Sequence, residues 1–135
     1  MRTAVQLLLY VTREQVENLE IHKGVEDSMT AKVMFVVARR SDINRTRCRG
    51  EWAGEKHRRI VEAVPGLRKW VLNHVVSEEG KSLPDGIGEL WFDDADALET
   101  AMSSSEMGSA IEDAKRFLDM DKTYAVLVEE EPVLG

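Results

Sequence analysis

The sequence predicts an α+β protein in which helices cover one face of an antiparallel sheet. Two observations support this fold class. From residue 31 onward, apolar segments of strand length alternate with helical patterns in the order β-α-β-β-α-β, with the second helical region in two parts. The chain has 135 residues, which is the usual length of one domain. This order of elements is that of the ferredoxin-like fold.

Residues 1–30 precede this pattern, and we expect them to form an N-terminal extension to a domain of residues 31–135. The apolar run at residues 4–11 predicts a short strand. Thr12 and Gln15 have the spacing of a capping box, which predicts a short helix after that strand. The apolar run is too short to cross a bilayer, since a transmembrane helix needs about 20 residues. We therefore expect no membrane association.

Residues 32–38, with the sequence Lys-Val-Met-Phe-Val-Val-Ala, predict the clearest strand. Both faces of this segment are apolar, which predicts a central strand that is covered on both sides. A helix should follow over about residues 43–64, because Pro65 and Gly66 end the helical pattern. Residues 67–76 predict the second strand, whose side chains alternate between the two faces.

The second half of the chain continues this order, with strands predicted at residues 87–92 and 122–128. Asp93 or Asp94 is placed to cap a helix after the first of these strands. A further helix has a capping box made by Ser103 and Glu106, and its apolar stripe consists of Met107, Ala110, Ile111, Ala114, Phe117 and Leu118.

An antiparallel sheet with helices on one face leaves its other face open to water. The predicted strands are apolar on both faces, so the open face of this sheet needs a cover. A second copy of the sheet would provide one, which predicts a two-fold homodimer. The N-terminal extension is the competing cover.

Charge is unevenly distributed along the chain. With 18 basic and 25 acidic residues the net charge is −7, which argues against a protein devoted to nucleic acid. Residues 39–59 hold eight basic and three acidic residues (+5), whereas residues 77–135 hold four basic and sixteen acidic ones (−12). The basic stretch is either a solvated surface or a positive rim that attracts an anionic small molecule.

Several kinds of site find no support in the sequence. Cys48 is the single cysteine, which excludes an intrachain disulfide and a cysteine-rich zinc site and favours a cytoplasmic protein. Cys48 is either incidental or made reactive by its neighbours Arg47 and Arg49. The three histidines lack metal-ligand spacing, so we expect no metal. There is no nucleotide-binding glycine motif and no nucleophile elbow.

His57 is the first candidate for chemistry. At 100° per residue it falls in an apolar arc of the helix predicted over residues 43–64. This arc comprises Thr46, Gly50, Ala53, His57, Ile60, Val61 and Val64, with Arg49 at its edge. His57 is either a core histidine with one hydrogen bond or a general acid/base whose pKa is tuned by burial.

Other residues are candidates for a small-molecule site. Trp52, Trp70 and Trp91 would form its apolar walls, or each belongs to the core. His74 projects from the second predicted strand and would line the same pocket as His57. Glu89 is either an inward carboxylate that orients a histidine or a solvent-facing residue.

These residues resemble the EthD domain family, which is named for ethyl tert-butyl ether degradation. The opening strand and the Trp-x4-His segment of the family resemble residues 32–40 followed by Trp52 and His57. The Pro-Gly-Leu turn into a strand resembles residues 64–74, and the third strand of the family resembles residues 85–93. The resemblance covers most of the chain.

The resemblance implies a dimeric α+β barrel that binds a small apolar or oxygenated organic ligand and works without a cofactor. It places the family histidine at His57. Under this hypothesis His74 or Glu89 assists the histidine, and the substrate lies among Trp52, Arg49, Trp70, Trp91 and Phe117. The implied activity is that of an isomerase or a lyase (a dehydratase, cyclase or decarboxylase) on an oxygenated cyclic or polyketide-like substrate. Two alternatives remain: a non-catalytic accessory protein of a catabolic or biosynthetic pathway, and a cofactor-free monooxygenase.

Overall fold

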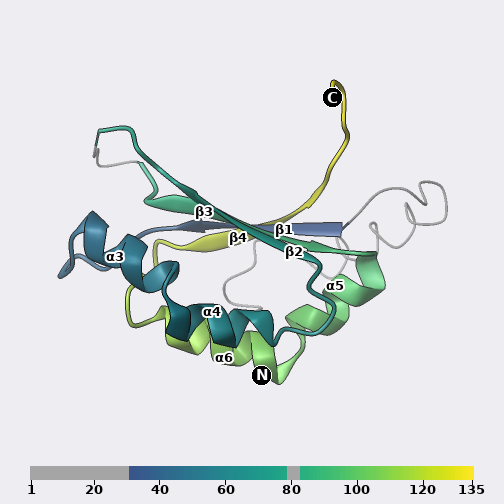
Figure 1. Ribbon diagram of the computed structural model, residues 1–135, viewed down its shortest axis with the longest axis horizontal. Helices are drawn as coiled ribbons and strands as arrows, with labels where there is room; N and C mark the ends of the chain where they lie inside the picture. The colour runs from purple at the N-terminus through teal and green to yellow at the C-terminus, as the bar shows by residue number, and fades with distance from the viewer. Residues whose placement is uncertain (1–30, 79–82) are drawn as a thin grey trace.

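The computed structural model describes residues 31–78 and 83–135, and Figure 1 shows a four-stranded antiparallel sheet with the described helices on one side. The sheet has the order β2-β3-β1-β4 and consists of β1 (Ala31–Val37), β2 (Lys69–His74), β3 (Gly86–Phe92) and β4 (Tyr124–Glu129). The helices are α3 (Arg45–Trp52), α4 (Glu55–Glu62), α5 (Ala95–Met102) and α6 (Ser105–Ala114). This order confirms the β-α-β-β-α-β pattern and the ferredoxin-like class. The extension predicted for residues 1–30, with its strand and helix, lies outside the described residues.

β1 lies in the interior of the sheet, where it pairs with β3 on one side and with β4 on the other. On the helix side of β1, Val33 and Val37 are almost fully buried. On the opposite side, Met34 and Val36 are only half-buried. The central position predicted for this strand is confirmed, and the described part of the chain covers one of its two faces.

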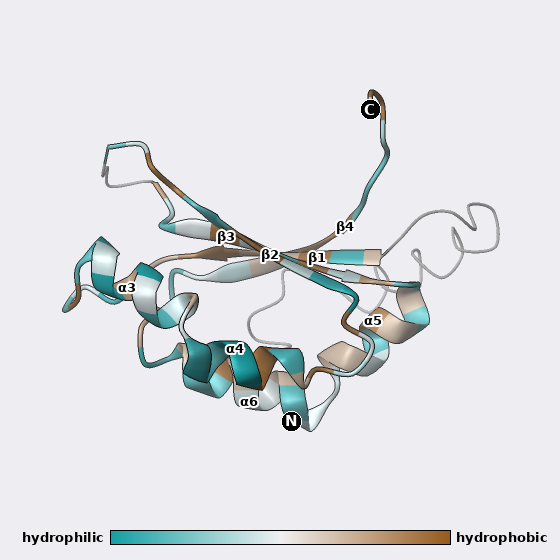
Figure 2. Ribbon diagram, viewed as in Figure 1, coloured by the Kyte–Doolittle hydropathy of each residue, from teal (hydrophilic) through white to brown (hydrophobic). Residues whose placement is uncertain are grey.

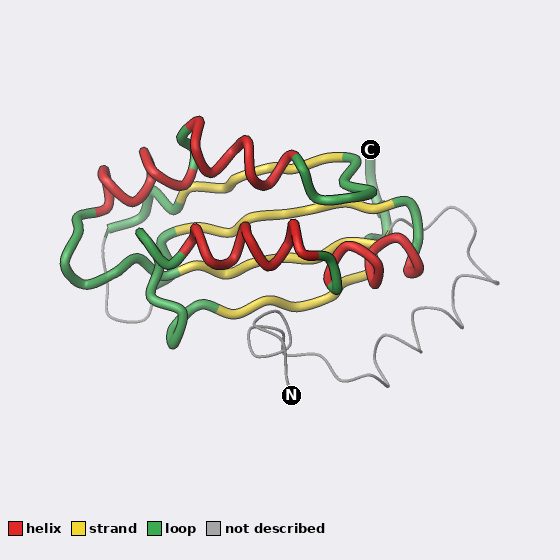
Figure 3. The backbone as a smooth tube through the Cα atoms, turned by 90° about the horizontal axis from the view of Figure 1, so that it is seen from below, coloured by secondary structure: helices red, strands yellow, loops and turns green. Residues whose placement is uncertain are grey.

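The helices lie on the sheet as two rows, α3 with α4 and α6 with α5 (Figure 3). α4 is largely hydrophilic with an isolated hydrophobic segment, as expected for a helix that buries one side (Figure 2). Val61 is the buried apolar residue of α4, and it belongs to the core between helices and sheet together with Phe92 and Leu98. Among the described helices, none is long and apolar enough to cross a membrane.

The single helix predicted over residues 43–64 is wrong, because the chain breaks into α3 and α4 at Ala53 and Gly54. Gly54 is extended (φ −72°, ψ 159°) and caps the start of α4. A Cβ atom at this residue would lie 2.6 Å from the carbonyl oxygen of Gly50. The close approach of the two helices at their junction therefore requires glycine.

This break changes which residues of α3 face the sheet. Thr46, Gly50 and Ala53, which a continuous helix would bury, are exposed. α3 instead buries Cys48 and Trp52. In α4 the projection holds, since the buried residues there are His57 and Val61.

The helix caps follow the expected chemistry with one shift. Asp94 caps α5, where its carboxylate accepts a hydrogen bond from the backbone N–H of Ala97 at 2.8 Å. The cap of α6 is Ser104 rather than Ser103, because Ser104 accepts from Met107 while Ser103 ends α5. All six residues of the predicted apolar stripe are buried, although α6 ends at Ala114 and the last two, Phe117 and Leu118, follow the helix.

Candidate functional site

A cavity of about 60 Å³ lies between the sheet and helices α3, α4 and α6. Because one water molecule needs about 10–15 Å³ of such space, the cavity has room for a ligand of only a few heavy atoms. Its walls are mainly apolar and include Trp52, Trp70 and Ile111. Apart from the indole rings, its polar side chains are His57 and Thr123. The Thr123 hydroxyl already hydrogen-bonds backbone groups, which leaves His57 as the titratable group of the cavity.

His57 projects from α4 and is only 5% exposed. Its Nδ1 lies 2.9 Å from Oδ2 of Asp113 on the neighbouring helix α6. The rings of Phe117 and Trp70 meet the imidazole edge-on, with centroid distances of 5.1 and 6.3 Å. One hydrogen bond and two aromatic contacts therefore fix the orientation of the ring.

The surroundings of the pair determine its protonation. Burial lowers the pKa of His57 below the ordinary 6.5, despite the opposing effect of Asp113, so the imidazole is neutral at pH 7. Hydrogen bonds from Arg116 and from His57 lower the pKa of Asp113 to about 2, so its carboxylate is ionised and can only accept. His57 must therefore donate from Nδ1, and its Nε2 keeps a lone pair.

The free nitrogen of His57 is the reactive feature of this arrangement. Within the part of the chain that the structure describes, Nε2 has no hydrogen-bond partner, and the ring lines the cavity. A neutral imidazole with one nitrogen fixed by a carboxylate and the other unprotonated is suited to general base catalysis.

Asp113 was not among the site residues predicted from the sequence. This residue directly precedes Ala114 in the buried stripe of α6, and its side chain is 6% exposed. An acidic residue bordering an apolar stripe was the available signal. That signal does not identify His57 as the partner of Asp113, because the two residues lie on different helices and are 56 positions apart in the sequence.

His74 and Arg49 do not line this cavity. They line a smaller one, of about 30 Å³, together with Cys48 and Asp85. Trp52 lines both cavities, and its ring meets the ring of His74 edge-on at 5.6 Å. Burial and the charge of Arg49 lower the pKa of His74 below its ordinary value. In residues 31–78 and 83–135, no three His, Cys, Asp or Glu side chains are grouped to hold a metal ion.

Glu89 and Trp91 lie on the face of β3 that points away from the helices. Lys32 forms an ion pair with Glu89 at 2.6 Å and holds the pKa of this carboxyl below its ordinary value. The Lys32 ammonium also lies 4.4 Å from the ring centroid of Trp91. The expectations that Glu89 orients a histidine and that Trp91 walls the pocket are therefore corrected. Asp113 orients His57 instead.

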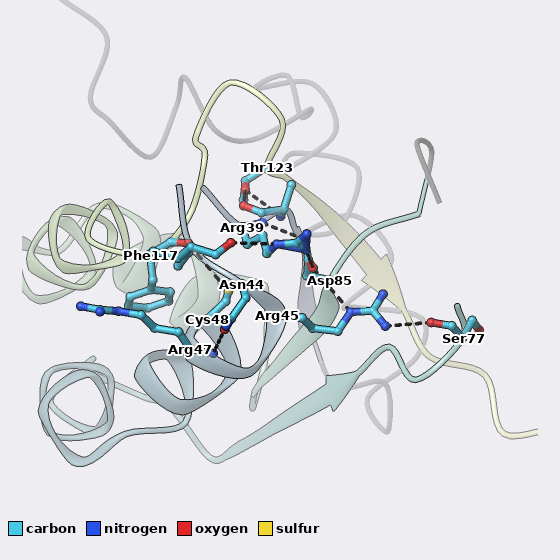
Figure 4. A network of polar contacts seen from close by, with 11 residues as sticks. Arg39, Asn44, Arg45, Arg47, Cys48, Ser77, Asp85, Phe117 and Thr123 are labelled. Carbon is cyan, nitrogen blue, oxygen red and sulfur yellow. Dashed lines mark hydrogen bonds and ion pairs between the residues drawn. The ribbon is translucent and has the colours of Figure 1, made fainter. Parts of the chain in front are cut away.

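Part of the basic stretch is engaged within the protein, in a network around Asp85 (Figure 4). The Asp85 carboxylate accepts hydrogen bonds from the backbone N–H and Nη1 of Arg39 at 2.8 and 3.2 Å. It also lies 3.8 Å from Nε of Arg45, which donates from Nη1 to the carbonyl oxygen of Ser77 at 2.8 Å. These contacts tie the start of α3 to the segments that flank the sheet.

We expect the thiol of Cys48 to be unreactive in the native protein. It is 2% exposed and donates a hydrogen bond to the carbonyl oxygen of Phe117 at 3.7 Å, and burial raises its pKa to about 11. The thiolate is the nucleophile, so labelling with dithionitrobenzoate at pH 8 should be at least about a hundredfold slower than in urea-unfolded protein. Equal rates in the two states would contradict the burial of this thiol.

The fold and the site together define a ferredoxin-like α+β protein with an apolar cavity and a buried histidine between its sheet and helices. The family model of the EthD domain matches residues 50–121, which is more than half of the chain. The chain therefore belongs to the EthD family, as the resemblance implied.

Solved structures agree with this fold. A crystal structure of an EthD family protein from Bacillus halodurans is 24% identical, with a TM-score of 0.62, over 76% of this chain and 100% of that one. A dimeric ferredoxin-like protein of unknown function from Thermobifida fusca is 10% identical, with a TM-score of 0.55, over 76% and 92%. A hypothetical protein from Arabidopsis thaliana is 11% identical, with a TM-score of 0.56, over 84% and 97%. No curated protein matches the sequence significantly.

Proposed function

We propose that the chain is a cofactor-independent enzyme in which Nε2 of His57 moves a proton at a carbon next to a carbonyl group. The observation that carries this proposal is the His57–Asp113 pair beside the apolar cavity. Nε2 takes the proton, the C–H electron pair moves toward the carbonyl to give an enolate, and the imidazolium then returns the proton. Isomerisation, dehydration and cyclisation can each begin with this step.

The cavity favours a small neutral substrate. Its described lining contains no lysine or arginine to neutralise an anion, and Arg49 lines the smaller cavity instead. Burying an uncompensated carboxylate in apolar surroundings costs several kcal/mol. An oxygenated cyclic compound of a few heavy atoms fits these limits, and a polyketide-sized one requires the cavity to widen.

The exchange of α-hydrogens for deuterium tests this function. Cyclopentanone and γ-butyrolactone are suitable probes, since both are small, neutral and carry exchangeable hydrogens next to a carbonyl. Proton NMR in D2O should show faster loss of these hydrogens with the protein than with an equal concentration of imidazole. Exchange no faster than with imidazole for every carbonyl probe would overturn the enzyme proposal.

The cavity should discriminate by charge. We expect γ-butyrolactone to bind at least about tenfold more tightly than butyrate, which has the same heavy atoms, because burying the carboxylate removes its hydration and provides no cationic partner. Isothermal titration calorimetry at pH 7 gives both affinities. Preferential binding of butyrate would contradict the assignment of the ligand to the His57 cavity.

The second candidate is a non-catalytic protein that holds an apolar metabolite for a partner. The observation that favours it is the lining, in which His57 is the only titratable side chain among the described residues. Binding of neutral ligands without any hydrogen exchange would select this candidate. The cytoplasmic location favoured by the single cysteine remains a prediction.

We further propose that two copies pair through the open face of the sheet, as in a dimeric α+β barrel. Half-buried apolar side chains line this face, namely Met34, Val36, Val71, Ile87, Val126 and Val128. The Thermobifida fusca protein of the same fold is dimeric, which supports this arrangement. Sedimentation equilibrium should give the mass of two chains. A monomer at all concentrations would leave the N-terminal extension as the cover.

A further inference from the structure

We propose that Arg116, held in place by Glu51, is a positioning residue that keeps the Asp113 carboxylate aimed at Nδ1 of His57. This inference rests on the proposed function, because it assigns Arg116 a part in preparing the base. It concerns the state of the imidazole ring, which can be measured without any substrate.

The contacts of Arg116 form a two-sided clamp. On one side its guanidinium donates two hydrogen bonds to Asp113, from Nε to Oδ1 at 2.7 Å and from Nη2 to Oδ2 at 3.1 Å. On the other side Nη1 lies 2.7 Å from Oε2 of Glu51. Oδ2 of Asp113 is the same oxygen that receives the hydrogen bond from His57. The fork geometry therefore sets the direction in which this oxygen faces the imidazole.

The burial of Asp113 distinguishes the Asp113–Arg116 pair from ordinary surface ion pairs. The side chain of Asp113 is 6% exposed, whereas both partners of the Lys115–Glu112 pair on the same segment are at least 50% exposed. Exposed pairs contribute little, but a buried carboxylate without its partner loses its main compensation. Arg116 is also the largest cause of the low pKa of Asp113.

Arg116 is better placed than the other charged groups around the His57–Asp113 pair to hold the Asp113 carboxylate. Lys56 also approaches Asp113, but its Nζ is 3.9 Å away and its side chain is 68% exposed. Phe117 and Trp70, which flank the imidazole, carry no charge. Among the described groups, Arg116 is thus the cation with hydrogen bonds to both oxygens of Asp113.

Glu51 connects the clamp to the wall of the cavity. It lies in the last turn of α3, directly before Trp52, whereas Arg116 follows α6. The Glu51–Arg116 contact therefore joins two segments 65 positions apart in the sequence. In this way one arginine holds both the carboxylate behind His57 and the helix that carries Trp52.

The test measures the tautomer of His57 by two-bond ¹H–¹⁵N correlation spectra of the full chain at pH 7. Wild type should show His57 with the proton on Nδ1. In Arg116→Gln the Asp113 carboxylate is no longer held by the guanidinium, so its hydrogen bond with Nδ1–H of His57 should weaken. A hydrogen bond to a charged group favours the donating form by at least about tenfold, so the ratio of the Nδ1–H to the Nε2–H form should fall by about that factor. Glu51→Gln should shift the ratio in the same direction by less. Lys115→Gln, a matched loss of charge at the preceding residue, should leave it unchanged.

A folded Arg116→Gln variant with the wild-type tautomer ratio would overturn the proposal, as would an equal shift in Lys115→Gln. If Arg116→Gln does not fold, Glu51→Gln decides, and a wild-type ratio in that variant overturns the proposal. Failure of the proposed function gives a different pattern, with no hydrogen exchange by wild type but a tautomer that still depends on Arg116.

Discussion

Replacing His57 with asparagine is expected to lower the rate of α-hydrogen exchange by about 10²–10⁴-fold, which is the usual contribution of a general base. The amide nitrogen of asparagine lies near the position of Nδ1, so it can still donate to Asp113 at a site where the native distance is 2.9 Å. The group that is lost is Nε2, which provides the lone pair at the cavity. Deuterium exchange of cyclopentanone, followed by proton NMR, measures the effect.

Two controls separate a loss of chemistry from a loss of fold. The melting temperature of His57→Asn and its affinity for γ-butyrolactone should stay close to the wild-type values. His74→Asn removes a histidine from the smaller cavity and should leave the exchange rate nearly unchanged. An exchange rate for His57→Asn equal to that of wild type would show that the base lies elsewhere.

Replacing Gly86 with alanine is expected to destabilise the fold by about 3 kcal/mol, which is the upper range for overpacking a close contact. A Cβ atom there would overlap Cζ3 of Trp52 and lie 2.7 Å from the carbonyl oxygen of Asn73. The indole could move aside, but the backbone oxygen of the neighbouring strand cannot. Urea unfolding followed by circular dichroism measures the loss.

Two other glycines provide matched comparisons. Gly88 also faces Trp52, but its Cβ atom would lie 3.1 Å from Cζ2, so alanine there should cost less than at Gly86. Gly50 is an exposed position of α3 with nothing within 4 Å of a Cβ atom. Alanine at Gly50 should stabilise the protein by about 0.5–1 kcal/mol through helix propensity. Equal stability of the Gly86 and Gly50 variants would contradict the packing of Trp52 on β3.

Much of the fold could be predicted because its signals are local. The strand at residues 32–38, the stripe of α6 and the cap at Asp94 each depend on residues close together in the sequence. The break at Gly54 was missed because the reason for glycine there is the carbonyl oxygen of Gly50, which comes close only once the two helices have formed.

The candidate site could be predicted only in part. The projection placed His57 on the buried side of its helix, which is correct, since that side depends on periodicity alone. Strand alternation put Glu89 and Trp91 on one face of β3 but could not tell which face the helices cover. The covered face is the one with Gly86 and Gly88, because Trp52 fills the space that they leave.

The pairing of His57 with Asp113 and the contact of Arg116 with Glu51 could not be predicted from the sequence for a related reason. Both contacts join residues far apart in the sequence, and no local pattern specifies which residues of two helical segments will meet. Charge patterning predicts pairs at short spacing within a helix, whereas the Glu51–Arg116 contact spans 65 positions.

The most direct test of the account is a ¹⁵N NMR titration of the His57 ring in the wild-type protein. We expect a neutral ring with its proton on Nδ1 at pH 7. Burial disfavours the charged form and lowers the pKa of His57, so the ring should gain a second proton only at a pH below the ordinary value of 6.5. A ring that is protonated on both nitrogens at pH 7, or neutral with its proton on Nε2, would contradict it, since no lone pair would then be available at the cavity.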